Sequence, residues 1–268
     1  MKKKTKKKKK RNKKENRRRK ITAKKKNSKQ LKDQIKDNIL IKTKSDWQKK
    51  ALVNKKQYEK KYNDSIKHND EFWKKEGKRI NWIKPYTKIK DVKYSKTDVS
   101  IKWYYDGTLN ASANCIDRHL KKNKDKTAII WVGDDPKVQK KITYKQLHQE
   151  VSKTANALKD LGIKKGDRVT IYLTMIPELA YTMLACARIG AIHSIIFGGF
   201  SPDSIAGRIN DCKSDYVITA DEGLRGGKTI HLKSITDEAL IHCPKVKKCI
   251  VVKRTGNRVN WDKSRDVW

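Results

Sequence analysis

Residues 169–220 read VTIYLTMIPELAYTMLACARIGAIHSIIFGGFSPDSIAGRINDCKSDYVITA, and this stretch decides the fold. Three apolar runs in it, VTIYL, AIHSIIF and DYVITA, have the length and the β-branched content of buried strands. Pro177 and Ser201-Pro202 are typical helix starts between these runs, and Gly190 is placed to end the first helix. Strands that alternate with helices and read as continuous apolar runs predict a layered α/β fold, a parallel sheet with helices on both faces.

The same alternation continues on both sides of this stretch. Before it, the run TAIIWV predicts a strand, and Thr143 with Gln146 at capping-box spacing predicts the start of a helix that Gly162 ends. After it, we expect a glycine-bearing loop, a helix near residues 233–242 and the strand KCIVVKR.

Composition divides the chain into three parts. Residues 1–44 form a Lys-rich tail, in which the first 30 residues hold 19 of the 68 basic residues and one acidic residue, Glu15. Like charges that bury nothing predict disorder there. Residues 45–125 are expected to form short helices ending near Gly77 and to dock on a larger body through aromatic side chains. Residues 126–268 are expected to form the first part of the α/β domain, interrupted where the chain ends.

Net charge and cysteine content bear on which partners the chain could bind and on the redox compartment it suits. The formal net charge of +39 suits a tail that binds nucleic acid or an anionic surface, and a lysine-rich extension with only incidental affinity for anions is the alternative. Five cysteines without a C-x-x-C pair indicate neither a disulfide framework nor a zinc site, which favours a reducing, cytoplasmic setting.

Membrane and catalytic signatures are not found either. The basic start has no apolar segment after its charges, so we do not expect a secretory signal, and charges with Pro177 interrupt the apolar stretch 175–200. No Ser/His/Asp set, paired carboxylates or metal-ligand cluster emerges, so the sequence assigns neither a catalytic residue nor a metal ligand.

Two glycine-rich loops follow predicted strands, where open parallel sheets bind their ligands. In the first, Phe197-Gly198-Gly199-Phe200, the glycines would let a ligand approach the backbone, and an aromatic ring could cover a flat group beside the positive end of the next helix. A tight turn with both rings in the core is the alternative.

The second loop, ADEGLRGGKT, has Arg225 and Lys228 on either side of Gly226-Gly227. Two cations with N–H-rich backbone between them suit a phosphate group, and a solvated loop is the alternative. The loop is not predicted to be a P-loop, because Glu222 stands where that motif requires glycine and would repel phosphates.

From about Leu52 onward the sequence resembles the acetyl-CoA synthetases, acetate–CoA ligases of the AMP-forming, adenylate-forming superfamily. The resemblance covers roughly four fifths of the chain. It is carried by YNDSI, FW, WIKPY, VSIKWYYDGTLNASANCIDRHL, DKTAIIWVGDD, LGIKKGDRVTIYLTMIPELAYTMLACARIGAIHSIIFGGFSPDSIAGRI, VITADEGLRGGKTIHLK and VVKRTG.

This resemblance implies an enzyme that makes acetyl-CoA from acetate, ATP and CoA through acetyl-adenylate, with Mg²⁺. It implies that CoA contacts the residues of the two loops, the adenine at Phe197, Gly198 and Gly199 and the phosphate-bearing ribose near Arg225, Gly226, Gly227 and Lys228. The ATP loop, the Mg²⁺ ligands, the acetate pocket and the C-terminal domain would follow Trp268, so we expect part of the CoA site and no adenylation from these residues alone. A non-catalytic remnant and a Lys-rich nucleic-acid-binding protein stay open as alternatives.

Overall fold

The computed structural model describes residues 42–268 and divides the chain into two compact units, with the division after Lys67. The predicted disordered tail, residues 1–44, lies almost entirely outside the described residues. No helix within the described part is both long and apolar enough to cross a bilayer.

The described part of the first unit consists of two helices, α2 (Ser45–Lys50) and α3 (Lys55–Lys67). Two reciprocal hydrogen bonds precede α3, because Asn54 Oδ1 accepts from Gln57 N and Gln57 Oε1 accepts from Asn54 N, both at 2.9 Å. This exchange satisfies backbone N–H groups that a helix start leaves without partners.

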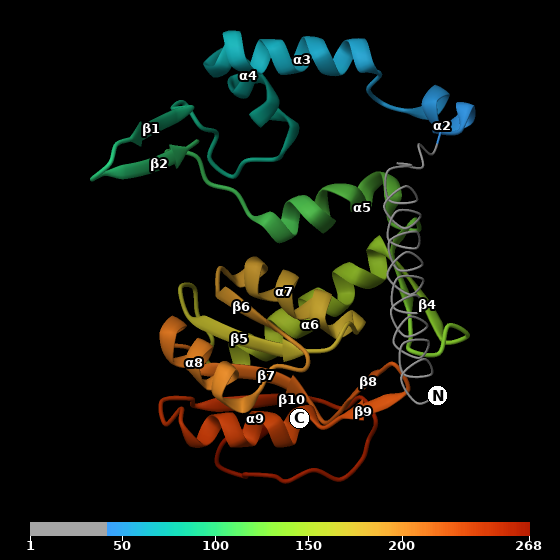
Figure 1. Cartoon of the computed structure of the whole chain (residues 1–268), viewed down its shortest axis with the longest axis vertical. Helices are drawn as coiled ribbons and strands as arrows, with labels where there is room; N and C mark the ends of the chain where they lie inside the picture. The colour runs from blue at the N-terminus through green and yellow to red at the C-terminus, as the bar shows by residue number, and fades with distance from the viewer. Residues whose placement is uncertain (1–41) are drawn as a thin grey trace, which may run out of the picture. The chain divides into compact units, whose positions relative to one another are not determined.

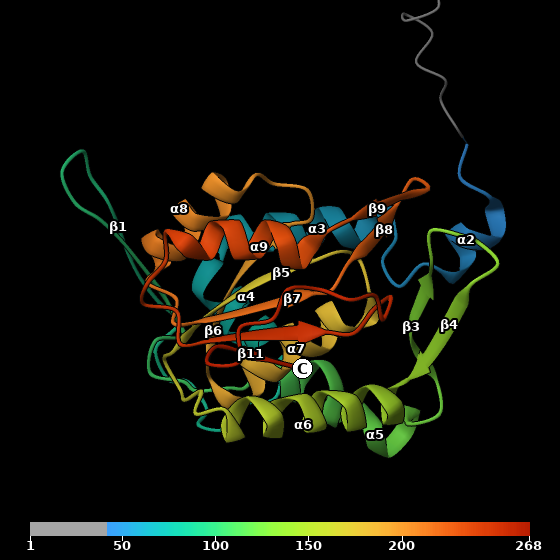
Figure 2. The ribbon, with the colours of Figure 1, turned by 90° about the horizontal axis from the view of Figure 1, so that it is seen from below.

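The second unit is built around a five-stranded sheet in which every pair of neighbouring strands is parallel (Figure 1). In spatial order its strands are β11 (Asp266–Val267), β10 (Lys248–Val252), β7 (Tyr216–Ala220), β5 (Arg168–Leu173) and β6 (Ile192–Phe197). The helices that flank it are α6 (Tyr144–Asp160), α7 (Pro177–Ile189), α8 (Pro202–Cys212) and α9 (Leu232–Ile241). Figure 2 shows α8 and α9 on one face of the sheet and α6 and α7 on the other. The predicted layered α/β class is therefore confirmed.

The helix boundaries follow from local chemistry that the sequence already displays. Thr143 Oγ1 accepts from Gln146 N at 3.2 Å and Gln146 Oε1 accepts from Thr143 N at 2.9 Å, so the predicted capping box opens α6. Gly190 ends α7 with φ +78°, in the left-handed region where glycine avoids steric cost. Between these helices, β5 is buried from Val169 to Leu173 and forms the centre of the core.

The segment before the sheet contributes smaller elements. They are α4 (Asn69–Glu76), η1 (Gly77–Arg79), β1 (Lys90–Tyr94), β2 (Val99–Trp103), η2 (Ala113–Asp117) and α5 (Arg118–Asn123). Strands β1 and β2 form an antiparallel hairpin. The rings of Trp82, Tyr86 and Tyr104 pack together with centroids 4.5–5.5 Å apart, and Asp117 pairs with Arg188 of α7. This aromatic packing lies within the segment itself. The contacts to the α/β body are polar: the Asp117–Arg188 ion pair and the hydrogen bonds from Asn110 Nδ2 to the carbonyls of Ala187 and Arg188, at 3.1 and 3.0 Å. Docking through aromatic side chains stays a prediction.

Two strand pairs lie outside the parallel sheet and differ from the expected regular alternation. The predicted strand TAIIWV, β3 (Thr127–Val132), pairs antiparallel with β4 (Gln139–Thr143), because a short turn returns the chain directly where a parallel crossover needs a helix. The expected glycine-bearing loop is a hairpin of β8 (Gly223–Arg225) and β9 (Lys228–Ile230). Its two turn residues, Gly226 and Gly227, have φ +59° and +72°, the left-handed values that a two-residue type I′ turn demands.

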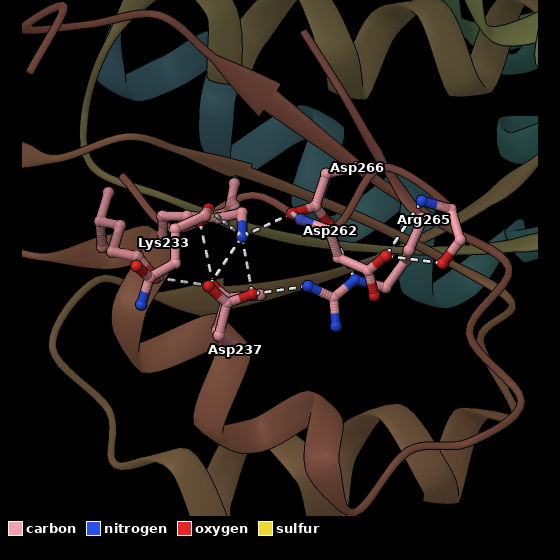
Figure 3. A network of polar contacts seen from close by, with 10 residues as sticks. Lys233, Asp237, Asp262, Arg265 and Asp266 are labelled. Carbon is pink, nitrogen blue, oxygen red and sulfur yellow. Dashed lines mark hydrogen bonds and ion pairs between the residues drawn. The ribbon is translucent and has the colours of Figure 1, made fainter. Parts of the chain in front are cut away.

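A network of buried charges fixes α9 to the segment that leads into β11 (Figure 3). Lys233 Nζ lies 2.7 Å from both carboxylate oxygens of Asp237 and 2.8 Å from Asp266 Oδ2, and it donates to the Asn260 carbonyl at 3.1 Å. Arg265 bonds both carboxylates, at 2.7 Å to Asp237 and 2.8 Å to Asp266. Because each buried charge has opposite partners, the ammonium of Lys233 is tolerated although the residue is 0% exposed.

Candidate functional site

A cavity of about 240 Å³ opens at the carboxyl end of the parallel sheet. The chain leaves β5 toward α7 on one face and leaves the adjacent β7 toward α9 on the other, so the connections diverge at this edge. Such a point of divergence is where open α/β sheets bind ligands. The residues that line the cavity come from the last residues of β3 and β6, from the turns after β3, β5, β6 and β10 and from the β8–β9 hairpin.

The first predicted loop forms one wall of this cavity. Phe197, the last residue of β6, is 55% exposed and lines the cavity with Gly198, so its ring is not buried in the core. Gly199 has φ +111°, a conformation that side chains with a Cβ rarely adopt. Ser201 then caps α8, because its Oγ accepts from Ser204 N at 3.4 Å.

Tyr172 of β5 fixes this turn from beneath. Its hydroxyl accepts from Gly199 N at 3.1 Å and donates to the Phe200 carbonyl at 3.4 Å. Burial raises the pKa of the Tyr172 hydroxyl, so it stays neutral at physiological pH. The sequence carried a signal for this role, since a buried tyrosine one position before a strand end needs a partner for its hydroxyl.

The second predicted loop lies against the first. The guanidinium carbon of Arg225 is 4.9 Å from the centroid of the Phe197 ring, and Arg225 Nη1 donates to the Gly198 carbonyl at 3.4 Å. A planar guanidinium over an aromatic face is held in a defined position while its outer N–H groups stay available. The structure therefore brings Phe197, Gly198, Gly199 and Arg225 together at one rim of the sheet.

The backbone of the Gly226-Gly227 turn is occupied by a side chain that sequence reasoning missed. Asp134, which follows β3, accepts from Gly226 N at 2.6 Å and from Gly227 N at 2.8 Å. These N–H groups, expected to face a phosphate, are therefore engaged with a carboxylate. An aspartate in a turn 92 residues away carries no sequence signal of this pairing.

Lys228 stands directly opposite Arg225 in the hairpin register, so the two side chains project from the same face of the hairpin. Lys228 is exposed and does not line the cavity. Of the predicted cations, Arg225 alone lines the cavity, and Lys228 lies beside it on the hairpin surface.

A second guanidinium–aromatic pair lines the same cavity. The guanidinium carbon of Arg254 is 5.2 Å from the centroid of the Trp131 ring, and Trp131 Nε1 donates to the Met175 carbonyl at 2.8 Å. Sequence reasoning missed both residues. Arg254 is the last residue of the predicted strand KCIVVKR, and in the structure β10 already ends at Val252, two residues before it. The rule that ligands bind beyond the carboxyl ends of strands could therefore have pointed to this position.

Glu222 lies just before the hairpin and holds a neighbouring loop. Its carboxylate accepts from Thr255 Oγ1 at 2.8 Å and Asn257 Nδ2 at 2.7 Å and lies 2.9 Å from His231 Nδ1. The hydrogen bonds from Thr255 and Asn257 lower the pKa of Glu222, which stays ionised. This carboxylate holds the loop after β10, and the residues after it form a hairpin where a P-loop would lead into a helix.

Comparison with known proteins gives two family matches. Residues 116–267 match the family model described as AMP-binding enzyme, and residues 58–115 match the model described as Acetyl-coenzyme A synthetase N-terminus. Among curated relatives, the acetyl-coenzyme A synthetase of Parvibaculum lavamentivorans is 62% identical over 224 residues, which is 84% of this chain and 35% of that protein. The acetyl-coenzyme A synthetase of Mesorhizobium japonicum is 59% identical over 226 residues, 83% of this chain and 35% of that protein.

A solved structure supports the fold. The chain is similar to acetoacetyl-CoA synthetase from Streptomyces lividans with a TM-score of 0.67 and 24% identity, over 76% of this chain and 31% of that one. The chain spans about a third of the length of these relatives. The segment directly before the longer family match is similar to the N-terminus of acetyl-coenzyme A synthetases. Since one family model matches more than half of the chain, the chain belongs to the AMP-binding enzyme family.

Proposed function

We propose that this chain supplies the nucleotide end of the CoA site in an acetate–CoA ligase. The complete reaction would join acetate to ATP, giving acetyl-adenylate and pyrophosphate, and the CoA thiol would then displace AMP. Mg²⁺ would accompany ATP as its usual counter-ion. The share assigned to residues 68–268 is the grip on the adenine and on the ribose phosphate of CoA.

One observation carries this proposal: Arg225 stacks at 4.9 Å on Phe197 at the wall of a cavity beyond the sheet's carboxyl end. A flat base fits an aromatic and glycine surface, and a phosphate fits the open side of a guanidinium. Lys228, on the same face of the hairpin, adds a second positive charge for that phosphate. The high identity to acetyl-coenzyme A synthetases supports CoA over other ligands with a phosphate and a base.

The five free cysteines support a reducing, cytoplasmic location, because Cys186, Cys243 and Cys249 are buried singly without disulfide partners. Burial raises the pKa of the Cys186 and Cys249 thiols to about 12, which keeps both protonated and unreactive. These cysteines act as small core residues.

The test is direct titration of the 268-residue chain with CoA, followed by calorimetry and by intrinsic tryptophan fluorescence. We expect Arg225→Glu to weaken CoA binding at least about tenfold, because it replaces a phosphate-binding cation by an anion. Arg258→Glu is the matched control: it makes the same charge change at an exposed arginine outside the cavity, and we expect less than about a threefold effect. Equal losses in the two variants would contradict the proposal, since general attraction of an anion to a basic chain would then explain the binding.

A further inference from the structure

The loop after β10 holds Arg254 in a fixed place at the carboxyl end of the sheet. Asp221, which follows β7 and is 0% exposed, accepts from Arg254 N at 2.8 Å and from Gly256 N at 2.8 Å. It also accepts from Thr255 N at 3.1 Å. Burial alone would raise the pKa of Asp221, but backbone N–H donors outweigh it and the net pKa is lowered. The backbone that carries Arg254 is therefore tied to the sheet by an ionised carboxylate.

The Arg254 side chain is also held, although no carboxylate neutralises it. Its guanidinium lies over the Trp131 ring, and the Trp131 indole is fixed by the bond to Met175. Among residues 42–268 no acidic group forms an ion pair with Arg254. A guanidinium that is half-buried, stacked on one face and unpaired keeps its N–H donors for a ligand.

The charged side chains that line the cavity are two arginines and one aspartate, and the aspartate already accepts hydrogen bonds from the protein backbone. Arg225 and Arg254 line it, each on an aromatic ring, whereas both oxygens of Asp134 are bonded to the Gly226-Gly227 turn. Two separately mounted guanidiniums suit a ligand with two anionic groups some distance apart. The nucleotide end of CoA has this form, since it carries a phosphate on the ribose and a diphosphate on the other side of the sugar.

We propose that Arg254, held by Trp131 and Asp221, binds the diphosphate of CoA, while Arg225 binds its ribose phosphate. The inference rests on the proposed function, which assigns the ribose phosphate to Arg225 and leaves the diphosphate to the second guanidinium. Trp131 is a positioning residue in this arrangement, because it orients the cation and does not itself meet the anion.

Three ligands separate the two anionic groups. CoA carries both, dephospho-CoA carries only the diphosphate, and adenosine 3′-monophosphate carries only the ribose phosphate. We expect Arg254→Gln to raise the Kd at least about tenfold for CoA and dephospho-CoA and to leave adenosine 3′-monophosphate within about twofold. Arg225→Gln should show the opposite pattern, with losses for CoA and adenosine 3′-monophosphate and little change for dephospho-CoA.

The control is Lys253→Gln, which removes one positive charge from the neighbouring exposed residue, whose ammonium lies over Trp268. Thermal unfolding of each variant checks that the loop after β10 stays folded, and Arg254→Lys, which keeps the charge, should recover only part of the affinity. The inference is overturned if Arg254→Gln matches Lys253→Gln, or if its loss appears with adenosine 3′-monophosphate, as base stacking would give. If the unaltered chain binds none of the three ligands, the proposed function itself fails. If Arg225→Gln behaves as expected and Arg254→Gln does not, the inference about Arg254 alone is wrong.

Discussion

Removal of the Asp134 carboxylate tests whether an acidic side chain inside an anion-binding cavity helps or hinders the ligand. Asp134 bonds the two backbone N–H groups of the Gly226-Gly227 turn at 2.6 and 2.8 Å, and this turn directly follows Arg225. Two consecutive glycines form a very flexible turn. We call the two bonds from Asp134 the clamp, because they decide what fraction of the time Arg225 is held at the cavity wall. Asp134→Ala removes the clamp and a negative charge at once.

The two consequences have opposite signs, and their magnitudes can be compared. Two charge-assisted bonds at an exposed turn contribute about 1 kcal/mol each, the low end of their range because water competes for both partners. Loss of a negative charge roughly 8 Å from a phosphate gains about 0.5 kcal/mol in water. The net loss is about 1.5 kcal/mol, which corresponds to about tenfold weaker CoA binding as an upper bound. The full tenfold loss is expected if the turn without its clamp spends most of its time outside the CoA-binding conformation. The apparent affinity is proportional to the fraction of molecules in that conformation.

Two measurements separate the clamp from the charge. Amide hydrogen exchange should accelerate at Gly226 and Gly227 in Asp134→Ala, and CoA affinity should fall. Asp134→Asn, whose amide oxygen still accepts one bond, should fall between the variant and the parent chain. Asp135→Asn makes the same charge change in the adjacent residue, which bonds Lys137 N and lies outside the cavity, so it should tighten CoA binding slightly. Tighter CoA binding by Asp134→Ala with unchanged exchange would refute the reasoning, because the carboxylate would then act only as a repulsive charge.

Three further predictions concern stability. Gly199→Ala should cost about 1–2 kcal/mol in urea unfolding because Gly199 has φ +111°, whereas Gly207→Ala, in the exposed face of α8 with open space around it, should stabilise by about 0.5–1 kcal/mol. Lys233→Met leaves the buried carboxylate of Asp266 and the partly buried carboxylate of Asp237 with Arg265 as their shared cation, and it should cost about 3–5 kcal/mol. Lys247→Met, whose ion pair is exposed, should cost less than about 1 kcal/mol. Folding lowers the pKa of Asp221, so this carboxylate adds to the free energy of unfolding fully above its unfolded pKa of about 4, and the contribution is lost as pH falls through the folded pKa. In Asp221→Asn the free energy of unfolding should therefore fall less steeply as the pH is lowered below about 4.

The strands and helices of the sheet were predictable because their signals are local. Capping pairs, a proline in the first helical turn and a glycine beyond the last lie within a few residues of the boundary that they define, as at Thr143, Pro177 and Gly190. Local sequence does not, however, predict which strand another strand pairs with. TAIIWV reads as a core strand by composition, yet β3 pairs with β4 outside the sheet, because the length of the connection decides between parallel and antiparallel pairing.

The candidate site was predictable only in part, for a related reason. Phe197 and Arg225 stand at strand ends and in a glycine turn, so the sequence itself marks their positions as candidate ligand contacts. What holds them comes from elsewhere in the chain: Tyr172 for the Phe197 turn and Asp134 for the Arg225 turn. Side-chain-to-backbone bonds over 27 and 92 residues depend on the completed fold, and no spacing rule predicts them.

These supporting bonds have one feature in common that matters for the affinity of the cavity for an anionic ligand. Tyr172, Asp134 and Asp221 each hold the backbone of one turn at the cavity, and none of them holds a guanidinium. The cations Arg225 and Arg254 are instead placed by aromatic faces, with one further bond from Arg225 Nη1 to the Gly198 carbonyl, and their other N–H donors stay available. A carboxylate paired directly with either arginine would place it equally well but would compete with the phosphate for the same donors. Acidic groups in the turns and rings beneath the cations therefore preorganise the site and leave the guanidiniums free of competing carboxylate partners where the ligand binds.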